Sequence, residues 1–227
     1  FNVVRFDDTY DVLFPDTVPG DAGHVATADR FVAGLEAAGG TEMVPALIAA
    51  LTDPRPSDLT RVRQVILLTD GAIGNERELF AAIDAKQGRS RIFMVGIGSA
   101  PNTFLMARAA EIGRGTFTHI GETGEVAARM RALFEQLESP VVTSLAVDLP
   151  EMTADITPSP LPDLYRGEPL VIAIRAGKLA GTIEVRGLAG ETPWVVRLPV
   201  AGAAPGVGIS KLWARRRIGD EEAAGTI

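Results

Sequence analysis

The sequence predicts an α/β fold: an open, mostly parallel β-sheet with helices on both faces, followed by a small antiparallel β domain with a C-terminal helix. Three observations support this class. Strand-like and helix-like segments alternate over residues 1–139, as in folds that are built on a parallel sheet. Residues 62–69 and 91–98 contain continuous apolar runs, which are typical of strands buried on both faces. After Pro140, short strand-like segments are separated by Gly and Pro turns.

The first half begins with two short runs of β-branched or aromatic residues, 1–8 and 11–14, which predict a hairpin. Apolar residues then recur at helical spacing and predict a helix that stops at Gly39 and Gly40. The face of this helix that we expect to be buried consists of Val25, Ala28, Phe31, Val32 and Leu35. Further elements are a strand at residues 116–120 and helices at residues 42–51, 76–86, 101–112 and 122–137. We expect the last of these helices to bury Phe134.

The second half predicts mainly strands. They are expected at residues 141–149, 169–176, 181–187 and 194–201. Residues 157–162 (TPSPLP) predict a loop, and residues 209–224 predict a final helix that carries the basic run Arg215 to Arg217 on a solvated face. We therefore divide the chain into an α/β domain of residues 1–139 and a β-rich domain of residues 140–227.

Composition excludes several functional classes. The 227 residues carry 22 basic and 29 acidic side chains, for a net charge of −7. Nucleic-acid binding depends on Lys and Arg contacts to phosphates, and anionic membranes attract basic segments, so the acidic balance argues against both. No apolar run approaches the ~20 residues of a membrane span. The chain has no cysteine and two histidines, which excludes thiol chemistry and argues against a site with several imidazoles.

Thr41 and Asp70 are the candidate functional residues. Ligands of open parallel sheets bind at the carboxyl ends of the strands. Asp70 directly follows the strand predicted at residues 62–69 and precedes Gly71. Thr41 follows two glycines at the start of a predicted helix. Hydroxyl and carboxylate oxygens suit hard cations such as Mg²⁺, Mn²⁺ or Ca²⁺. The alternative is that both residues are N-caps of the following helices.

Five strings occur in order over residues 1–139: FNVVRFDD, GGTEM, VILLTDGAIGNE, RIFMVGIGSAPN and GRGTFTHI. Together they resemble the von Willebrand factor type A domain, in the branch found in inter-α-trypsin inhibitor heavy chains and their bacterial relatives. The β-rich segment that ends in KLWARRRIGD also resembles the segment after this domain in the bacterial relatives. The resemblance implies a Rossmann-like sheet that carries a metal-ion-dependent adhesion site.

In the family, an Asp-x-Ser-x-Ser loop, a Thr and an Asp hold a divalent cation, Mg²⁺ or Mn²⁺. Thr41 and Asp70 match the second and third of these elements. The first is missing: residues 53–57 (DPRPS) and 155–159 (DITPS) do not match it. By the resemblance, Phe1 corresponds to the second strand of the family. We therefore expect a truncated domain without its first strand, in which metal binding is weak or absent.

The resemblance implies a non-enzymatic adhesion module, in which an acidic side chain of a protein partner completes the coordination of the cation. It also implies a location outside the cell or in the cell envelope. Two alternatives stay open: a structural spacer with a vestigial site, and a metal-assisted hydrolase that uses Asp70 together with Glu42 or Glu76. Without the first strand, the neighbouring strands keep open edges. Those edges predict a homodimer formed by strand exchange or edge pairing.

Other polar residues favour structural roles. Asp7 and Asp8 are expected in a solvated hairpin turn, His119 is expected to be packed and hydrogen-bonded, and His24 is expected to be exposed near a helix start. The sequence Gly96-Ile97-Gly98 is half of a dinucleotide-binding fingerprint, but Pro101 interrupts it, so it carries little weight.

Overall fold

The structure is a computed structural model. It describes residues 1–36, 39–58, 61–70, 75–99, 101–138, 141–149, 154–177, 180–201 and 204–223. The first half contains β1 (Val4–Phe6), β2 (Tyr10–Val12), α1 (Ala22–Ala33), α2 (Met43–Leu51), β3 (Arg63–Thr69), α3 (Glu76–Lys86), β4 (Ser90–Ile97), α4 (Thr103–Ile112), β5 (Phe117–Ile120), the 3-10 turn η1 (Thr123–Glu125) and α5 (Val126–Leu137). The second half contains β6 (Val142–Asp148), β7 (Ala154–Thr157), β8 (Ala173–Ala176), β9 (Thr182–Ala189), β10 (Thr192–Pro199) and α6 (Ile209–Ala223).

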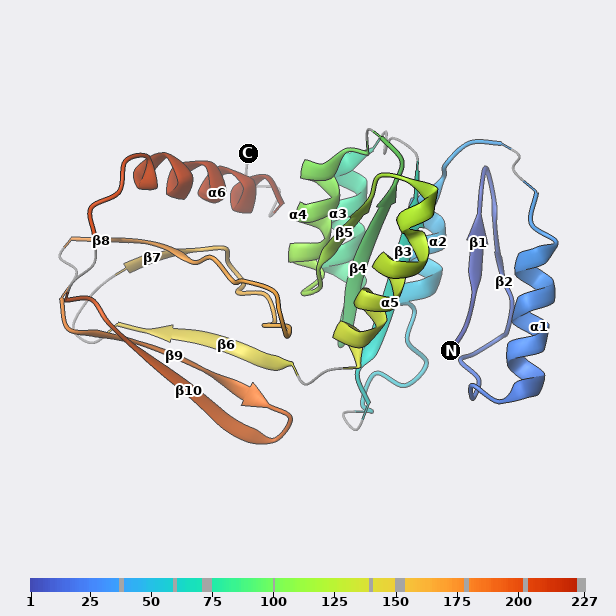
Figure 1. Ribbon diagram of the computed structural model, residues 1–227, viewed down its shortest axis with the longest axis horizontal. Helices are drawn as coiled ribbons and strands as arrows, with labels where there is room; N and C mark the ends of the chain where they lie inside the picture. The colour runs from blue at the N-terminus through green and yellow to red at the C-terminus, as the bar shows by residue number, and fades with distance from the viewer. Residues whose placement is uncertain are drawn as a thin grey trace.

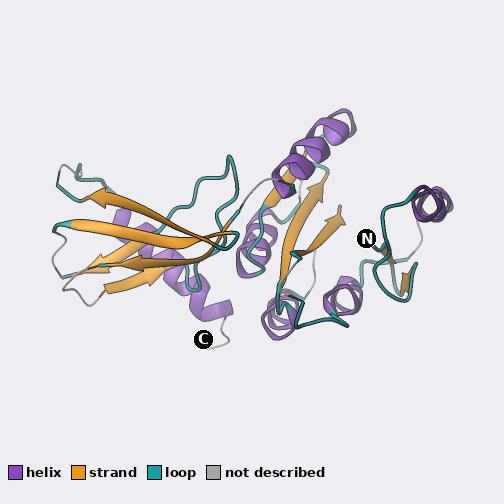
Figure 2. Cartoon of the chain, turned by 90° about the horizontal axis from the view of Figure 1, so that it is seen from below, coloured by secondary structure: helices purple, strands orange, loops and turns teal. Residues whose placement is uncertain are grey.

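The central sheet is parallel, with the strand order β3-β4-β5. Strand β4 lies in the middle, and its side chains alternate between two cores. Ile92 and Met94 pack with residues of α2, α3 and α4, whereas Phe93 and Val95 pack on the side of α5. Helices therefore cover both faces of the sheet (Figures 1 and 2). This arrangement confirms the predicted α/β class.

The β1–β2 hairpin is separate from the parallel sheet. Among the described strands, β1 pairs only with β2, and β3 pairs only with β4. Helix α2 contacts β1, β2 and β3, so it joins the hairpin to the parallel sheet (Figure 1). One edge of β1 and one edge of β3 are consequently left without a strand partner in the part of the chain that is described.

The predicted buried faces of two helices are wrong in part. On α1 only Ala28 is buried. Val25 and Val32 on this helix, and Leu35 after its end at Ala33, are 42–52% exposed. No described helix or strand makes extensive contact with α1, so most of its apolar face stays exposed. On α5, Leu133 is buried as expected, but Phe134 is 48% exposed.

The second half forms the antiparallel sheet β10-β9-β6 and the hairpin β7–β8, with α6 against β7 and β8. The predicted strands and final helix are present, but β7 (ADIT) is an additional strand, and it ends at Thr157 where we expected a loop. Residues 139 and 140, where we placed the domain boundary, lie outside the described residues. None of the described helices has both the length and the apolar character of a membrane span.

Buried ion pairs join the two halves. Arg91 on β4 pairs with Asp163, whose side chain is 4% exposed. The carboxylate of Asp220 on α6 accepts hydrogen bonds from Arg108 of α4 at 2.7 Å and from the Thr157 hydroxyl at 2.7 Å. Because these groups are desolvated, each depends on its partner.

The expectation that Arg215, Arg216 and Arg217 form a solvated face is wrong in part: Arg215 is exposed, but each of the three side chains contacts another group of the protein. Arg215 lies over the ring of Phe104, and Arg216 is 3.5 Å from Glu111. Arg217 pairs with Glu221, one turn further along α6. The run is therefore spread over different partners, two of which lie on α4.

Candidate functional site

Thr41 follows a turn that only glycine fits well. Gly39 has φ +77°, in the left-handed region that favours glycine. The carboxylate of Asp8 accepts a hydrogen bond from the Gly40 N–H at 2.7 Å. A Cβ atom at Gly39 would lie 2.6 Å from Asp8 Oδ2, and one at Gly40 would lie 2.8 Å from Asp8 Oδ1. The glycine pair thus lets the chain approach Asp8 closely immediately before Thr41.

The β1–β2 turn also contacts residues 39–42, the segment that contains Thr41. Hydrogen bonds from the backbone and hydroxyl of Thr9, together with the Arg5 guanidinium, hold the pKa of Asp7 below its ordinary value. The Asp7 carbonyl accepts a hydrogen bond from the Glu42 N–H at 2.8 Å. Asp7 and Asp8 lie in a hairpin turn, as predicted, but both also hold the turn of residues 39–42. Sequence reasoning missed this role of Asp8, for which the paired glycines are the available signal.

Asp70 comes directly after β3 and is exposed. Strand β3 ends, and α2 begins, at the same edge of the molecule, the upper one in Figure 1. The structure therefore brings Thr41 and Asp70 to the carboxyl end of the parallel sheet, where a ligand of an open sheet is expected. Gly71, which follows Asp70, lies outside the described residues.

Neither residue is a helix cap. The N-cap position of α2 is Glu42, without a side-chain cap, and the N-cap of α3 is Asn75, whose side chain accepts from the Glu78 N–H. The capping alternative is therefore wrong for both. Within the described part of the chain, no hydrogen bond or ion pair is formed by the Thr41 or Asp70 side chain. An exposed hydroxyl and an exposed carboxylate are thus available to a ligand.

The Thr41 hydroxyl and the Asp70 carboxylate are oxygen donors of the type that a hard cation prefers, but they are too few to fill its coordination shell. Mg²⁺ takes about six oxygen ligands and keeps several waters. Among the described residues, no group of three or more His, Cys, Asp or Glu side chains could hold a metal ion. Thr41 and Asp70 would therefore supply two protein oxygens of the right type, and further ligands would have to come from water or from another segment.

The remaining candidates are occupied by local contacts. His119 Nε2 is 2.9 Å from the Gly98 carbonyl, so the histidine is hydrogen-bonded as predicted, although it is exposed rather than packed. The ring of His24 is 2.8 Å from Asp21. Glu76 accepts a hydrogen bond from Asn102 at 3.0 Å.

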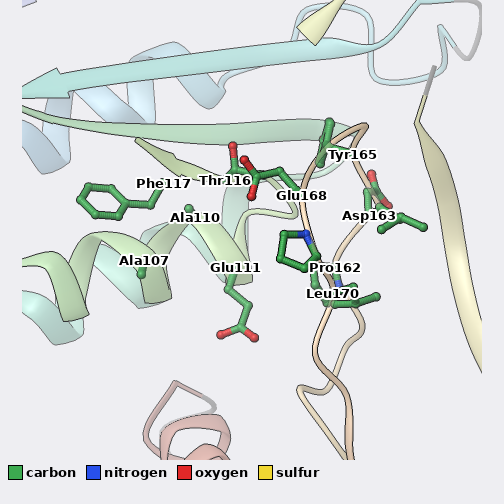
Figure 3. Close-up of a pocket in the computed structure, with 13 residues that line it drawn as sticks. Ala107, Ala110, Glu111, Thr116, Phe117, Pro162, Asp163, Tyr165, Glu168 and Leu170 are labelled. Carbon is green, nitrogen blue, oxygen red and sulfur yellow. The ribbon is translucent and has the colours of Figure 1, made fainter. Parts of the chain in front are cut away.

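A cavity of about 280 Å³ lies elsewhere, between α4, the start of β5 and residues 162–170 (Figure 3). Its lining includes Asp163, and burial raises the pKa of that carboxyl although Arg91 opposes the shift. Neither Thr41 nor Asp70 lines it. The cavity therefore belongs to the junction between the two halves of the chain and not to the candidate metal site.

The comparisons with known proteins identify the class to which this fold and site belong. The family model of the von Willebrand factor type A domain matches residues 1–119. The match covers more than half of the chain, so the protein belongs to the von Willebrand factor type A family.

Among similar proteins is the human inter-alpha-trypsin inhibitor heavy chain H4, which is 26% identical over 217 residues; the match covers 90% of this chain and 22% of the human protein. A von Willebrand factor A domain-containing protein from Dictyostelium discoideum is 25% identical over 174 residues, with coverages of 76% and 18%. The chain thus spans about a fifth of the length of these relatives.

A solved structure, described as von Willebrand factor type A from Catenulispora acidiphila, aligns with a TM-score of 0.62 at 19% identity. The alignment covers 88% of this chain and 56% of that one. At this identity the likeness shows the fold alone, and it confirms the α/β class that the sequence predicts.

Proposed function

We propose that the chain is a non-enzymatic protein-binding module, whose site at the carboxyl end of the parallel sheet uses a divalent cation, Mg²⁺ or Mn²⁺. Thr41 would contribute its hydroxyl, and Asp70 its carboxylate, directly or through a water. The cation would supply an exchangeable coordination position that an acidic side chain of a protein partner completes. The resemblance to inter-α-trypsin inhibitor heavy chains favours a location outside the cell or in the cell envelope.

The observation that carries this proposal is that the side chains of Thr41 and Asp70 neither cap a helix nor bond to another described residue. Surface Thr and Asp residues next to a helix start commonly serve as caps. Here the caps are other residues, and Asp8 and two glycines hold the turn before Thr41. A turn that is fixed by hydrogen bonds, next to a hydroxyl without a partner among the described residues, is expected at a binding site rather than in a spacer.

We also propose that the site is incomplete within these 227 residues. Two protein ligands leave most of an octahedral shell to water, which makes a weak site. The open edges of β1 and β3 leave room in the pairing scheme for one more strand between the hairpin and the parallel sheet. A segment placed there would end at the same edge of the sheet as Asp70, where it could add the missing oxygens.

The enzyme alternative gains no support from the site. A metal-assisted hydrolase needs a general base or a second carboxylate near the metal. Of the two glutamates considered for that role, Glu76 is bonded to Asn102 and Glu42 begins α2. The spacer alternative differs from the proposal in predicting no metal binding at Asp70.

Calorimetric titration with Mn²⁺ tests the proposal. We expect binding with a dissociation constant of about 1 mM or weaker, which Asp70→Asn and Thr41→Ala each abolish. Asp84→Asn serves as the control, because Asp84 is an exposed carboxylate on α3. If no heat is detected at any Mn²⁺ concentration the spacer is favoured, and micromolar binding that survives Asp70→Asn would mean that the ligands lie elsewhere.

A further inference from the structure

Strand β5 forms the outer edge of the parallel sheet opposite β3. The carbonyls of Thr116 and Ile120 accept hydrogen bonds from β4 and the residue after it. Because successive residues of a strand direct their backbone groups to opposite edges, the N–H and C=O groups of Phe117 and His119 point away from β4. Among the described strands, none pairs with that outer edge. Edges of this kind are templates for another extended chain.

A cavity of about 450 Å³ lies along this edge. One wall is α5, which contributes four side chains at helical spacing, Arg129, Ala132, Leu133 and Gln136. The other wall is the segment 166–168. Tyr165 anchors that segment, because its ring packs edge to face on Phe93 and its hydroxyl donates to the Arg114 carbonyl at 3.0 Å. The groove is therefore built from fixed elements, and its volume is within the range of ligand sites.

The cavity carries more positive than negative charge, although the chain as a whole has a net charge of −7. Arg129 and Arg166 line it, with Glu168 as the acidic group. Within the described residues Arg166 makes no ion pair. Arg129 pairs with Glu125 at 3.7 Å, one turn earlier on α5, and both of these side chains are about half exposed. In Figure 3, Glu168 extends from its loop toward Thr116 at the start of β5, in the neighbouring cavity. The Arg166 guanidinium is thus available to an anionic partner, and the exposed Arg129–Glu125 pair is weak enough for a carboxylate of a partner to replace Glu125.

We propose that this groove binds an extended peptide that carries an acidic side chain and that pairs with β5 as an added strand. The backbone of the peptide would bond to the free N–H and C=O groups of Phe117 and His119, which gives affinity without sequence preference. The acidic side chain would pair with Arg129 and Arg166, which gives selectivity. A small free anion would leave the strand edge unpaired, so the two features together favour a peptide.

This inference does not depend on the proposed metal site. Thr41 and Asp70 lie with α2 and β3, whereas the groove lies at β5, the opposite edge of the parallel sheet. Binding in the groove needs no cation. All measurements can therefore be made in EDTA, so that a failure of the metal site and a failure of the groove are distinguishable.

The probe is a fluorescein-labelled, N-acetylated peptide TVEVTVT, compared with TVKVTVT by fluorescence polarisation. We expect the Glu peptide to bind at least about tenfold more tightly than the Lys peptide, and the double variant Arg129→Glu with Arg166→Glu to reverse that order. Arg131→Glu is the matched control, because Arg131 is exposed on α5 but does not line the cavity. Equal binding of the two peptides would overturn the proposal.

Two further variants test the strand pairing itself. His119→Pro removes an N–H that faces the open edge and leaves the β4 pairing in place, whereas His119→Val removes the ring and keeps the N–H. We expect the first to weaken binding at least about tenfold and the second to preserve it. A Glu peptide N-methylated at alternate amides should lose binding to the unaltered protein, which tests the pairing without any change in the fold. Unchanged binding of the methylated peptide would contradict strand addition.

Discussion

At the scale of single residues, Thr41 and Asp70 differ from the polar side chains around them because the fold does not use them. Asp7 is held by Arg5 and Thr9, and Asp8 by the Gly40 N–H. Both candidate residues could be predicted from the sequence, because a carboxylate at a strand end and a hydroxyl after two glycines are local patterns. The support from Asp8 could not be predicted in the same way, since 32 positions separate it from Gly40.

The contact between Asp8 and Gly40 gives a coupled pair of substitutions. Gly40→Ala places a Cβ atom 2.8 Å from Asp8 Oδ1, so the carboxylate has to move away from the Gly40 N–H. We expect a loss of about 1 kcal/mol in the free energy of unfolding, the usual net value of one hydrogen bond. In an Asp8→Ala background the same change should cost almost nothing, because the clash and the bond are both gone. Urea titration of the unaltered protein, the two single variants and the double variant measures this coupling. Strictly additive losses in the free energy of unfolding would contradict it.

At the scale of the elements, the parallel core is predictable from local sequence and the junction of the two halves is not. The continuous apolar runs predict the positions of β3 and β4, since strands that are buried on both faces need no polar positions. Strand β4 is buried almost throughout, whereas β3 at the edge of the sheet leaves Leu68 44% exposed. The ion pairs Arg91–Asp163 and Arg108–Asp220 join residues 72 and 112 positions apart. Nothing local in the sequence indicates such a partner. The same holds for the arginine run of α6, because Phe104 and Glu111 are distant from it along the chain.

Two other expectations failed for different physical reasons. The spacing of apolar residues on α1 gives a face, but burial requires a second element, and none of the described ones covers it. Strand β7 has four residues and runs into the proline-rich segment TPSPLP. A strand of that length carries too little of the alternating pattern to be distinguished from a loop.

The buried carboxylate of Asp220 should be important for stability. Asp220→Ala removes the partner of the buried Thr157 hydroxyl. It also removes one of the two carboxylates that pair with Arg108, and leaves Glu111 as the other. We expect a loss of about 3 kcal/mol in the free energy of unfolding, which corresponds to a decrease of roughly 6–12 °C in Tm for a chain of this length. Asp84→Ala, at an exposed site, should change Tm little. Calorimetry that found equal effects for the two variants would show that the ion pair does not hold α6 in place.

At the scale of the whole molecule, the pairing scheme leaves strand edges open. One edge of β1 and one edge of β3 have no strand partner in the described residues, and open edges favour association. We therefore propose, in line with the expectation from the sequence, that the chain forms a homodimer by strand exchange or edge pairing. Light scattering after size-exclusion chromatography should give a mass that rises with concentration from 24.0 kDa toward twice that value. A monomer mass at every concentration would exclude the dimer.

The class of fold could be predicted from the alternation of strands and helices, and the family from five strings in register. The sequence could not show how the hairpin sits relative to the parallel sheet, because that depends on contacts of α2 with three strands. The division at residues 139 and 140 remains a prediction. The buried ion pairs across the junction lead us to expect that the two parts unfold together.

Amide NMR spectra recorded with substoichiometric Mn²⁺ would show whether Thr41 and Asp70 together form a cation site. Even weakly bound Mn²⁺ broadens the signals of nearby amides. We predict that broadening is strongest at residues 39–42 and at Asp70, disappears in Asp70→Asn, and persists in Asp84→Asn. Broadening that is strongest elsewhere, or that is unchanged in Asp70→Asn, would contradict the account.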